Sequence, residues 1–132
     1  MRRLTLDTSA HSAFKRNHPE VVERLRQARE LLVPAIVIGE LLGGFEVGGR
    51  SHKNRTELRL FLESPRVRLA AITRDTAERY AVVYASLRAS GTPIPTNDLW
   101  IAASTMEHGT ELLTLDRDFR HVTQILATVF EP

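Results

Sequence analysis

The sequence contains no cysteine, which excludes a disulfide framework, a thiolate zinc site and a cysteine nucleophile. Any metal site must therefore use oxygen or imidazole ligands. The first apolar run stops at Asp7, too early for a signal peptide, and no stretch reaches the apolar length of a membrane span. These absences predict a cytoplasmic protein with no membrane partner.

Lysine is nearly absent, because Lys15 and Lys53 are the only two among 18 basic residues. The remaining basic residues are arginines, the formal net charge is +2 and the pI is about 9.5. Arginine pairs with phosphate through a bidentate fork, so this bias is compatible with a nucleic-acid partner. A GC-rich genome produces the same bias, and composition alone therefore leaves both explanations open.

The 132 residues suit one compact domain, and we find no repeat or linker that divides it. Apolar patterns predict strands over 3–6, 31–33, 67–72, 111–115 and 125–130. Helices are predicted between them, through Phe14, over 19–31, 35–46, 52–62 and 75–89, and from Asp98 to Gly109. This alternation is typical of an α/β fold with a central parallel sheet flanked by helices. Ligands of such sheets bind beyond the carboxyl ends of the strands.

Acidic residues occupy four places that matter in such a fold. Asp7 directly follows the first predicted strand, and Asp116 and Asp118 follow the strand LLTL. Asp98 opens a nearly all-apolar helix, and Glu40 lies within the apolar stretch AIVIGELLGG. A lone carboxylate among apolar neighbours loses solvation unless another group compensates it, which makes Glu40 informative.

Each acid taken singly also has a purely structural explanation. Asp7 and Asp98 suit helix caps, Asp116 and Asp118 suit a solvated turn, and Glu40 suits solvent or an arginine partner. If the acids converge, two carboxylates about 4 Å apart repel by about 4 kcal/mol at an effective dielectric near 20. Such a cluster needs protons or a cation. Mg²⁺ or Mn²⁺ takes oxygen ligands and activates water for attack on phosphorus.

Four stretches carry a family resemblance: LDTSA, GELLGG, LRASGTPIPTNDLWIAA and LLTLDRDF. Together, and in this order, they resemble the motifs of PIN-domain ribonucleases. In chain length and in the residues of these motifs, the sequence is most similar to the VapC toxins of bacterial and archaeal toxin–antitoxin pairs. The resemblance covers nearly the whole chain and implies a single PIN domain over residues 1–132.

The resemblance assigns roles to the first three acidic positions. Asp7 matches the acid after the family's first strand, and Ser9 matches the polar position that supports it. Glu40 matches the helix glutamate, followed four residues later by the small residue Gly44. Asp98, in DLWIAA, matches the third acid. These three carboxylates are therefore expected to be catalytic and to hold metal.

The fourth acidic position of the family matches Asp116, which Thr114 precedes by two residues as a supporting group. Asp118 stands before Phe119 as in the family's DF pair, either as a supporting acid or as an alternative metal ligand, and we rank Asp116 ahead of it. Arg88 precedes the third acid and is a candidate RNA contact. A helix-end arginine that complements the local dipole is the competing interpretation.

The resemblance also implies an activity and partners. Proteins of this type cleave RNA with Mg²⁺ or Mn²⁺ and usually act as homodimers. A cognate VapB-like antitoxin holds them inactive, and its C-terminal segment covers the acidic site. We therefore expect a metal-dependent ribonuclease toxin.

Two other functions compete with this expectation. A magnesium-dependent phosphoacceptor would use Asp7 as a nucleophile, but such sites usually need a late lysine and this chain has none after Lys53. A catalytically degenerate PIN domain would only bind RNA or protein. Acids at all four family positions favour the enzyme.

Overall fold

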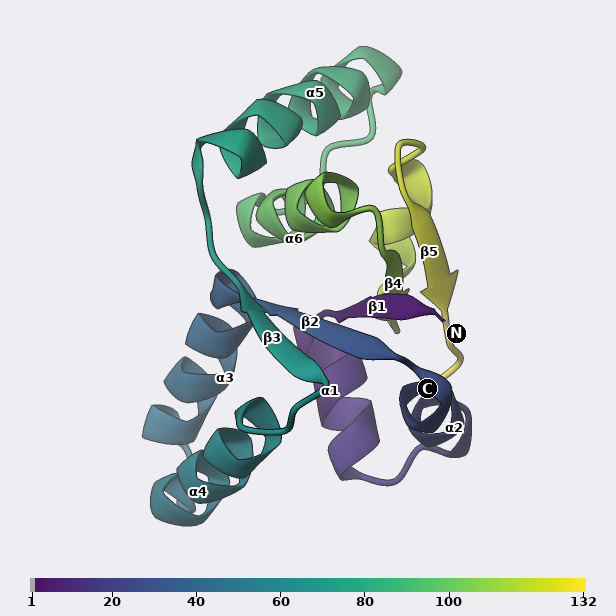
Figure 1. Ribbon diagram of the computed structural model, residues 1–132. Coiled ribbons are helices and arrows are strands. Elements are labelled where there is room, and N and C mark those ends of the chain that lie inside the picture. The colour runs from purple at the N-terminus through teal and green to yellow at the C-terminus, as the bar shows by residue number, and fades with distance from the viewer. Residues whose placement is uncertain (1) are drawn as a thin grey trace.

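The computed structural model describes residues 2–132. It contains one five-stranded sheet, in the order β3-β2-β1-β4-β5, and every neighbouring pair of strands is parallel (Figure 1). The strands are β1 (Arg3–Leu6), β2 (Glu30–Pro34), β3 (Val67–Ala70), β4 (Glu111–Thr114) and β5 (Leu126–Val129). The helices are α1 (Thr8–Lys15), α2 (Pro19–Gln27), α3 (Ala35–Val47), α4 (Ser51–Leu62), α5 (Arg74–Ser90), α6 (Thr96–His108) and the short 3₁₀ helix η1 (Arg117–His121).

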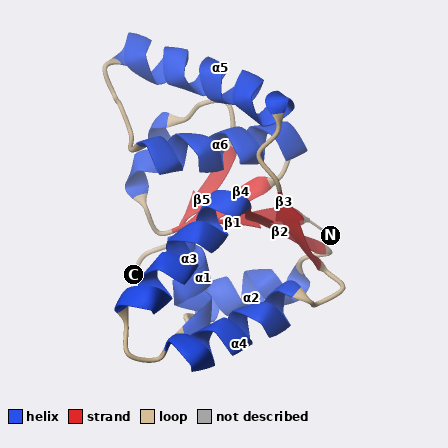
Figure 2. Cartoon of the chain, turned by 90° about the vertical axis from the view of Figure 1, so that its left-hand side faces the viewer, coloured by secondary structure: helices blue, strands red, loops and turns tan. Residues whose placement is uncertain are grey.

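The helices form a layer on each side of the sheet, with α1 to α4 on one side and α5 and α6 on the other (Figures 1 and 2). The central strands β1, β2 and β4 are almost wholly buried, whereas the edge strands β3 and β5 expose residues. Strands buried on both faces read as continuous apolar runs, which is why the sequence showed them without alternation. The predicted α/β fold with a parallel sheet is confirmed.

The order of the strands reverses beside β1. The chain first runs outward from β1 through β2 to β3, and then returns to the other side of β1 with β4 and β5. In an open parallel sheet such a reversal leaves a crevice beyond the carboxyl ends of the two strands concerned. Asp7 directly follows β1 and Asp116 lies just beyond β4, so both flank this crevice.

The helix end predicted at Gly109 is confirmed, and α5 likewise ends at a glycine. Gly91 and Gly109 both adopt a left-handed conformation, with φ of 70° and 61°, and they end α5 and α6. Residues with a Cβ rarely adopt this conformation, which explains glycine at these two positions.

Helix α2 is shorter than predicted, because it ends at Gln27 rather than at residue 31. The helical periodicity of the sequence continues, but residues 30–34 pair with both β1 and β3 and so become β2. The Arg66 guanidinium donates to the carbonyls of Leu25 and Ala28 at 2.8 and 2.6 Å and closes the shortened helix. Pairing within the sheet therefore overrides the local helical pattern.

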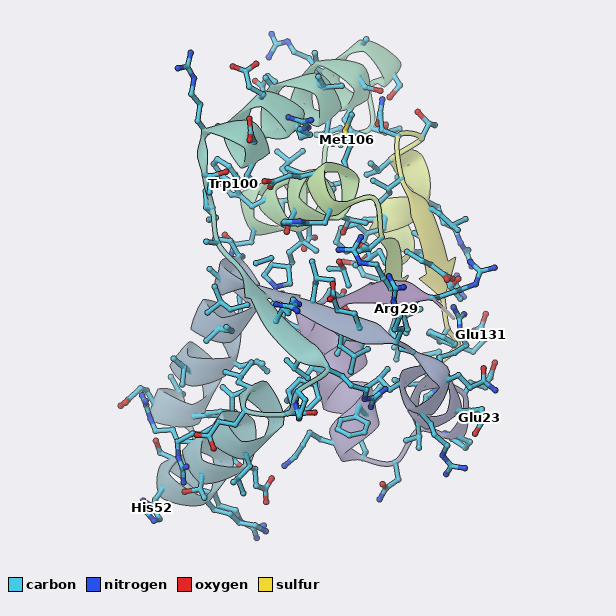
Figure 3. All side chains as sticks on the ribbon, viewed as in Figure 1. Glu23, Arg29, His52, Trp100, Met106 and Glu131 are labelled. Atoms are coloured by element: carbon cyan, nitrogen blue, oxygen red, sulfur yellow. The ribbon has the colours of Figure 1, made fainter. Side chains whose placement is uncertain are left out.

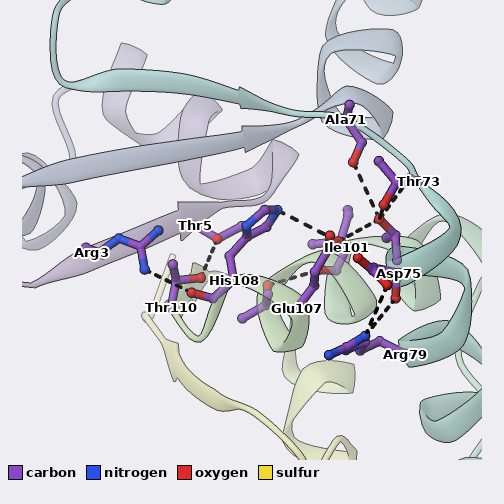
Figure 4. A network of polar contacts seen from close by, with 12 residues as sticks. Arg3, Thr5, Ala71, Thr73, Asp75, Arg79, Ile101, Glu107, His108 and Thr110 are labelled. Carbon is purple, nitrogen blue, oxygen red and sulfur yellow. Dashed lines mark hydrogen bonds and ion pairs between the residues drawn. The ribbon is translucent and has the colours of Figure 1, made fainter.

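Helices α5 and α6 are tied together by polar and aromatic contacts. The Thr76 hydroxyl donates to Glu107 Oε1 at 2.6 Å and accepts from the Thr73 amide at 3.0 Å (Figure 4). The rings of Tyr80 and Trp100 pack with centroids 4.3 Å apart (Figure 3 labels Trp100). These contacts hold α6 in place, and its first turn carries Asp98.

Among the described residues, no helix combines the length and the apolar character that crossing a bilayer requires.

Candidate active site

Asp7 is the most buried acid of the site, with 4% of its surface exposed. Its Oδ1 accepts from the Ala10 amide at 2.8 Å, and its Oδ2 accepts from the Thr114 hydroxyl at 2.5 Å. The Ser9 hydroxyl lies 2.8 and 2.9 Å from the two oxygens. Burial raises the pKa of Asp7, and these three donors oppose the rise. The carboxylate caps α1, as its structural explanation requires, and its charge also acts on Asp98.

Ser9 and Thr114, the two predicted supporting residues, connect Asp7 to the loop after β4. The Ser9 hydroxyl accepts from the Leu115 amide at 2.9 Å, and the Thr114 hydroxyl accepts from the Asp116 amide at 2.9 Å. Each hydroxyl therefore donates to Asp7 and accepts from the backbone. This pairing fixes the carboxyl ends of β1 and β4 relative to one another.

Asp98, Asp116 and Asp118 converge. Each offers a carboxylate oxygen, and these three oxygens all lie within 4.8 Å of one another. Asp116 caps η1 and accepts from the Asp118 amide at 2.9 Å, which brings the DxD pair into one tight turn. A set of three carboxylate oxygens suits a hard divalent cation such as Mg²⁺ or Mn²⁺.

Asp98 shows the cost of bringing these charges together. Partial burial raises its pKa to about 7, and the charges of Asp116, Glu40, Asp7 and Asp118 add to the rise. All four other predicted acids therefore act on this one carboxylate. The helix-cap explanation of Asp98 is wrong, because Pro95 occupies the cap of α6 and Asp98 lies inside the first turn.

Glu40 reaches the site from α3 and is held by two polar residues that we did not predict. Its Oε1 accepts from the Thr8 hydroxyl at 2.5 Å, and its Oε2 accepts from the Asn97 amide group at 3.3 Å. No arginine pairs with it among residues 2–132, so the arginine-pair explanation does not hold. Both missed residues could have been found from the sequence because each is next to a predicted acid. Thr8 follows Asp7, and Asn97 precedes Asp98.

Arg88 lies in the last turn of α5, where a cation complements the carbonyl end of the helix. Its Nη1 is 3.4 Å from the Tyr84 hydroxyl, and it lines a hollow of about 270 Å³ that also touches Pro93 and Leu99. None of the five predicted acids lines this hollow. The position of Arg88 therefore agrees with the dipole interpretation, and its contact with RNA stays a prediction.

We expect Thr114→Val to destabilise the protein by about 2 kcal/mol, because a buried carboxylate loses a donor and the Asp116 amide loses its acceptor. The pKa of Asp7, already raised, should rise further. A carboxyl whose folded pKa is raised loses stability as pH increases above its unfolded value of 3.8. Urea unfolding should therefore show a larger loss at pH 8 than at pH 5.

Thr105→Val is the matched control, because the buried Thr105 hydroxyl donates only to the Ile101 carbonyl of its own helix. Its effect should not change between the two pH values. Equal pH dependence in both variants would contradict the role given to Thr114.

The matching family model is that of the PIN domain, which covers residues 4–125. The chain therefore belongs to the PIN-domain family, in which it stands with the VapC proteins. Ribonuclease VapC4 of Mycobacterium tuberculosis is 33% identical to it over 88 residues, covering 66% of this chain and 67% of the relative.

Solved structures show the same fold. The DNA-bound VapBC of Salmonella typhimurium matches with a TM-score of 0.86 at 23% identity, covering 98% of each chain. VapBC-1 of nontypeable Haemophilus influenzae matches with a TM-score of 0.84 at 24% identity, covering 96% of this chain and 97% of that chain. The resemblance predicted from the four motifs is confirmed.

Proposed function

We propose that this chain is a metal-dependent ribonuclease, a toxin of the VapC type that hydrolyses RNA phosphodiester bonds. The observation that carries the proposal is the convergence of Asp98, Asp116 and Asp118, whose carboxylate oxygens lie within 4.8 Å of one another. Partial burial, together with the charges of the other four acids, raises the pKa of Asp98 to about 7. Carboxylates that the fold holds together in spite of their mutual repulsion serve as cation ligands in many nucleases. The name of the relative Ribonuclease VapC4 supports RNA as the substrate.

The metal ligands in this proposal are Asp98, Asp116 and Asp118, whose oxygens converge. Asp7 and Glu40, which the resemblance also expected to hold metal, lie outside that group of three and contribute charge to the site. When bound, Mg²⁺ or Mn²⁺ makes a water molecule more acidic and offsets the negative charge that develops on the phosphate. Hydrolysis joins the water oxygen to phosphorus and releases a ribose oxygen, which takes a proton.

The residues of the chain orient the site. Ser9 and Thr114 occupy the oxygens of Asp7, while Thr8 and Asn97 hold Glu40 from both sides. With its donors in place before substrate arrives, the site needs little reorganisation during the reaction. The catalytic residues we propose are Asp7, Glu40, Asp98 and Asp116.

A phosphoacceptor is less well supported by the site. An aspartyl nucleophile needs a free oxygen facing the substrate, but Asp7 is nearly buried and both of its oxygens accept hydrogen bonds. The binding-only PIN domain remains the alternative, and the measurement of turnover decides between them.

The test of the proposed activity is cleavage of single-stranded RNA by the purified chain. Cleavage should require Mg²⁺ or Mn²⁺, and EDTA should abolish it. Intact RNA after incubation with both metals would contradict the proposal in favour of a binding module.

The proposed partners are an antitoxin and a second copy of the chain. VapBC-5 of Mycobacterium tuberculosis, which shares the fold, is a member of the VapBC family of toxin–antitoxin systems, and this supports a protein inhibitor for this chain. We expect its expression to arrest growth, and co-expression of the small protein encoded directly upstream to restore it. Growth that is unaffected by expression would contradict the toxin.

The second copy is tested by the mass of the purified protein in solution. This mass should be twice the 14.9 kDa of one chain, which would establish the homodimer.

A further inference from the structure

The edge of the sheet opposite the acids is strongly basic. We use "amino edge" for the residues at the start of the parallel strands and for the neighbouring end of α2. Its charged residues are Arg2, Arg3, Arg24, Arg26, Arg29, Arg66 and Arg68, with Glu23, Glu30 and Glu111. Seven arginines stand beside three glutamates, whereas the opposite edge gathers Asp7, Asp98, Asp116, Asp118 and Glu40. The molecule thus separates its charges between the two edges.

Two of the three glutamates of the amino edge are each held between two arginines. Glu111 accepts from Arg24 Nη2 at 2.5 Å and from Arg2 Nη1 at 3.1 Å. Because hydrogen bonds to Thr128 and Arg24 outweigh its burial, the pKa of Glu111 is lowered and the carboxylate stays ionised. One carboxylate cannot satisfy two guanidinium forks, so N–H groups remain for another anion.

The second glutamate shows the same arrangement. Glu30 accepts from Arg3 Nε at 3.1 Å and from Arg68 Nε at 2.8 Å. Arg3 also donates to the carbonyl of His108 at 3.0 Å, so it serves the fold (Figure 4). The side chain of Arg68 is 68% exposed and leaves most of its donors in solvent.

Arg29 adds a charge with no partner. Between residues 2 and 132, its guanidinium makes no hydrogen bond or ion pair, and only its backbone amide is bonded, to the Arg2 carbonyl at 2.9 Å. It lines a hollow of about 310 Å³ together with Arg2, Arg3 and Thr110. Figure 3 shows Arg29 beside the start of the strands. Glu111 shares this hollow, but its charge is offset by the two arginines that hold it.

We infer that the amino edge is a docking surface for the phosphate backbone of a polynucleotide. Neighbouring strands lie about 4.8 Å apart, so the arginines at the starts of β3, β2 and β1 span about 10 Å. A stacked nucleic-acid strand carries one phosphate per about 3.4 Å, so the row matches about three phosphates. Arginine rather than lysine suits this ligand, because its planar fork binds phosphate oxygens in pairs.

The inference rests on the proposed function and extends it, since the basic edge would hold RNA on a molecule whose acidic site repels it. It does not depend on cleavage. Binding is measured in EDTA, where no divalent cation is present, and the outcome is therefore independent of catalysis.

The test is Arg29→Gln with Arg68→Gln, titrated with a fluorescent 20-nucleotide single-stranded RNA over a range of salt concentrations. Neither side chain is needed for the fold, because Glu30 keeps Arg3. Loss of two phosphate contacts should weaken binding about tenfold and lower the slope of log K against log salt by about 1.4. DNA of the same length should respond equally if phosphates alone are recognised, whereas an RNA-only effect would place the contacts on the ribose as well.

Arg50→Gln with Arg59→Gln is the matched control, because it removes the same charge from the region of α4. Its affinity should stay within about twofold of the wild type. Equal weakening by both pairs would show a general effect of net charge and would overturn the inference. The inference would also be overturned if Arg29→Gln with Arg68→Gln kept the affinity and the salt slope of the wild type. It would be overturned as well if the wild-type protein did not bind RNA at low salt.

Discussion

Asp98→Asn should abolish RNA cleavage and, at the same time, make the metal-free protein more stable at pH 8. Cleavage should fall about a thousandfold, which corresponds to about 4 kcal/mol of transition-state stabilisation. An amide keeps the shape of the side chain but carries no charge and is a poor ligand for a hard cation. The readout is the rate of single-turnover RNA cleavage in Mn²⁺.

The stability change follows from the burial of Asp98 and from the charges around it. Partial burial and four nearby carboxylates disfavour the ionised form of Asp98 in the folded state, so a neutral amide at pH 8 removes both costs. Against this, Asp98 lies in the first turn of α6, where loss of a negative charge costs about 0.5 kcal/mol. Because the side chain is partly exposed, solvent screens part of this repulsion, and we expect a net gain near 1 kcal/mol, which raises Tm by about 4 °C.

Asp75→Asn is the matched control, because Asp75 occupies the first turn of α5 at an exposed position. It should lose the helix-dipole contribution and a weak exposed ion pair with Arg79, lower Tm slightly and leave cleavage unchanged. A lower Tm in both variants would show that the acids do not crowd Asp98. Unchanged cleavage by Asp98→Asn would remove Asp98 from the catalytic residues.

Asp98→Asn should lower the cleavage rate but raise the stability, and this combination distinguishes a functional residue from a structural one. A residue that is kept for folding destabilises the protein when it is lost, whereas one that is kept for chemistry can stabilise it. Ser9 and Thr114 lie between these cases, because their hydroxyls serve both Asp7 and the backbone of the β4 loop.

The acids could be predicted from sequence because a simple rule places them. Parallel strands end at one edge of the sheet, and Asp7 and Asp116 follow strands that were visible as apolar runs. Asp98 and Glu40 stood out as charges in apolar helices. The partners of Glu40 were not predicted, because Thr8 and Asn97 approach it from α1 and α6, and a sequence pattern carries no information on such packing.

The amino edge illustrates the same limit. Arg2 and Glu111 are 109 positions apart, and they meet only because β4 is inserted beside β1 rather than beyond β3. Strand order is decided by packing of the whole chain, so the arginine composition indicated nucleic acid without locating a surface. The early end of α2 could not be predicted for the same reason. Residues 30–34 pair with two strands of the sheet, and this pairing overrides the helical pattern of the sequence.

The second large effect concerns pH, because protons and a divalent cation compete for the same carboxylates. Without metal, the folded pKa of Asp98 is about 7 and its unfolded value is 3.8, so the folded state holds the additional proton between these values. Stability of the metal-free protein should therefore fall as pH rises through this window, and it should reach its minimum above pH 7. Asp7, whose pKa is also raised, acts in the same direction.

Metal binding should show the reverse dependence. At pH 5.5 only about 3% of Asp98 is ionised if its pKa is near 7, so affinity for Mn²⁺ should be about 30-fold weaker than at pH 8. Calorimetric titration at the two pH values measures this ratio, and proton release on binding at pH 6 provides an independent check. Asp98→Asn should bind Mn²⁺ weakly at both values, since the competing proton is gone together with the ligand. Equal Mn²⁺ affinity of the wild type at pH 5.5 and pH 8 would mean that the cation binds away from Asp98, and the acidic cluster would then lose its proposed role as the metal centre.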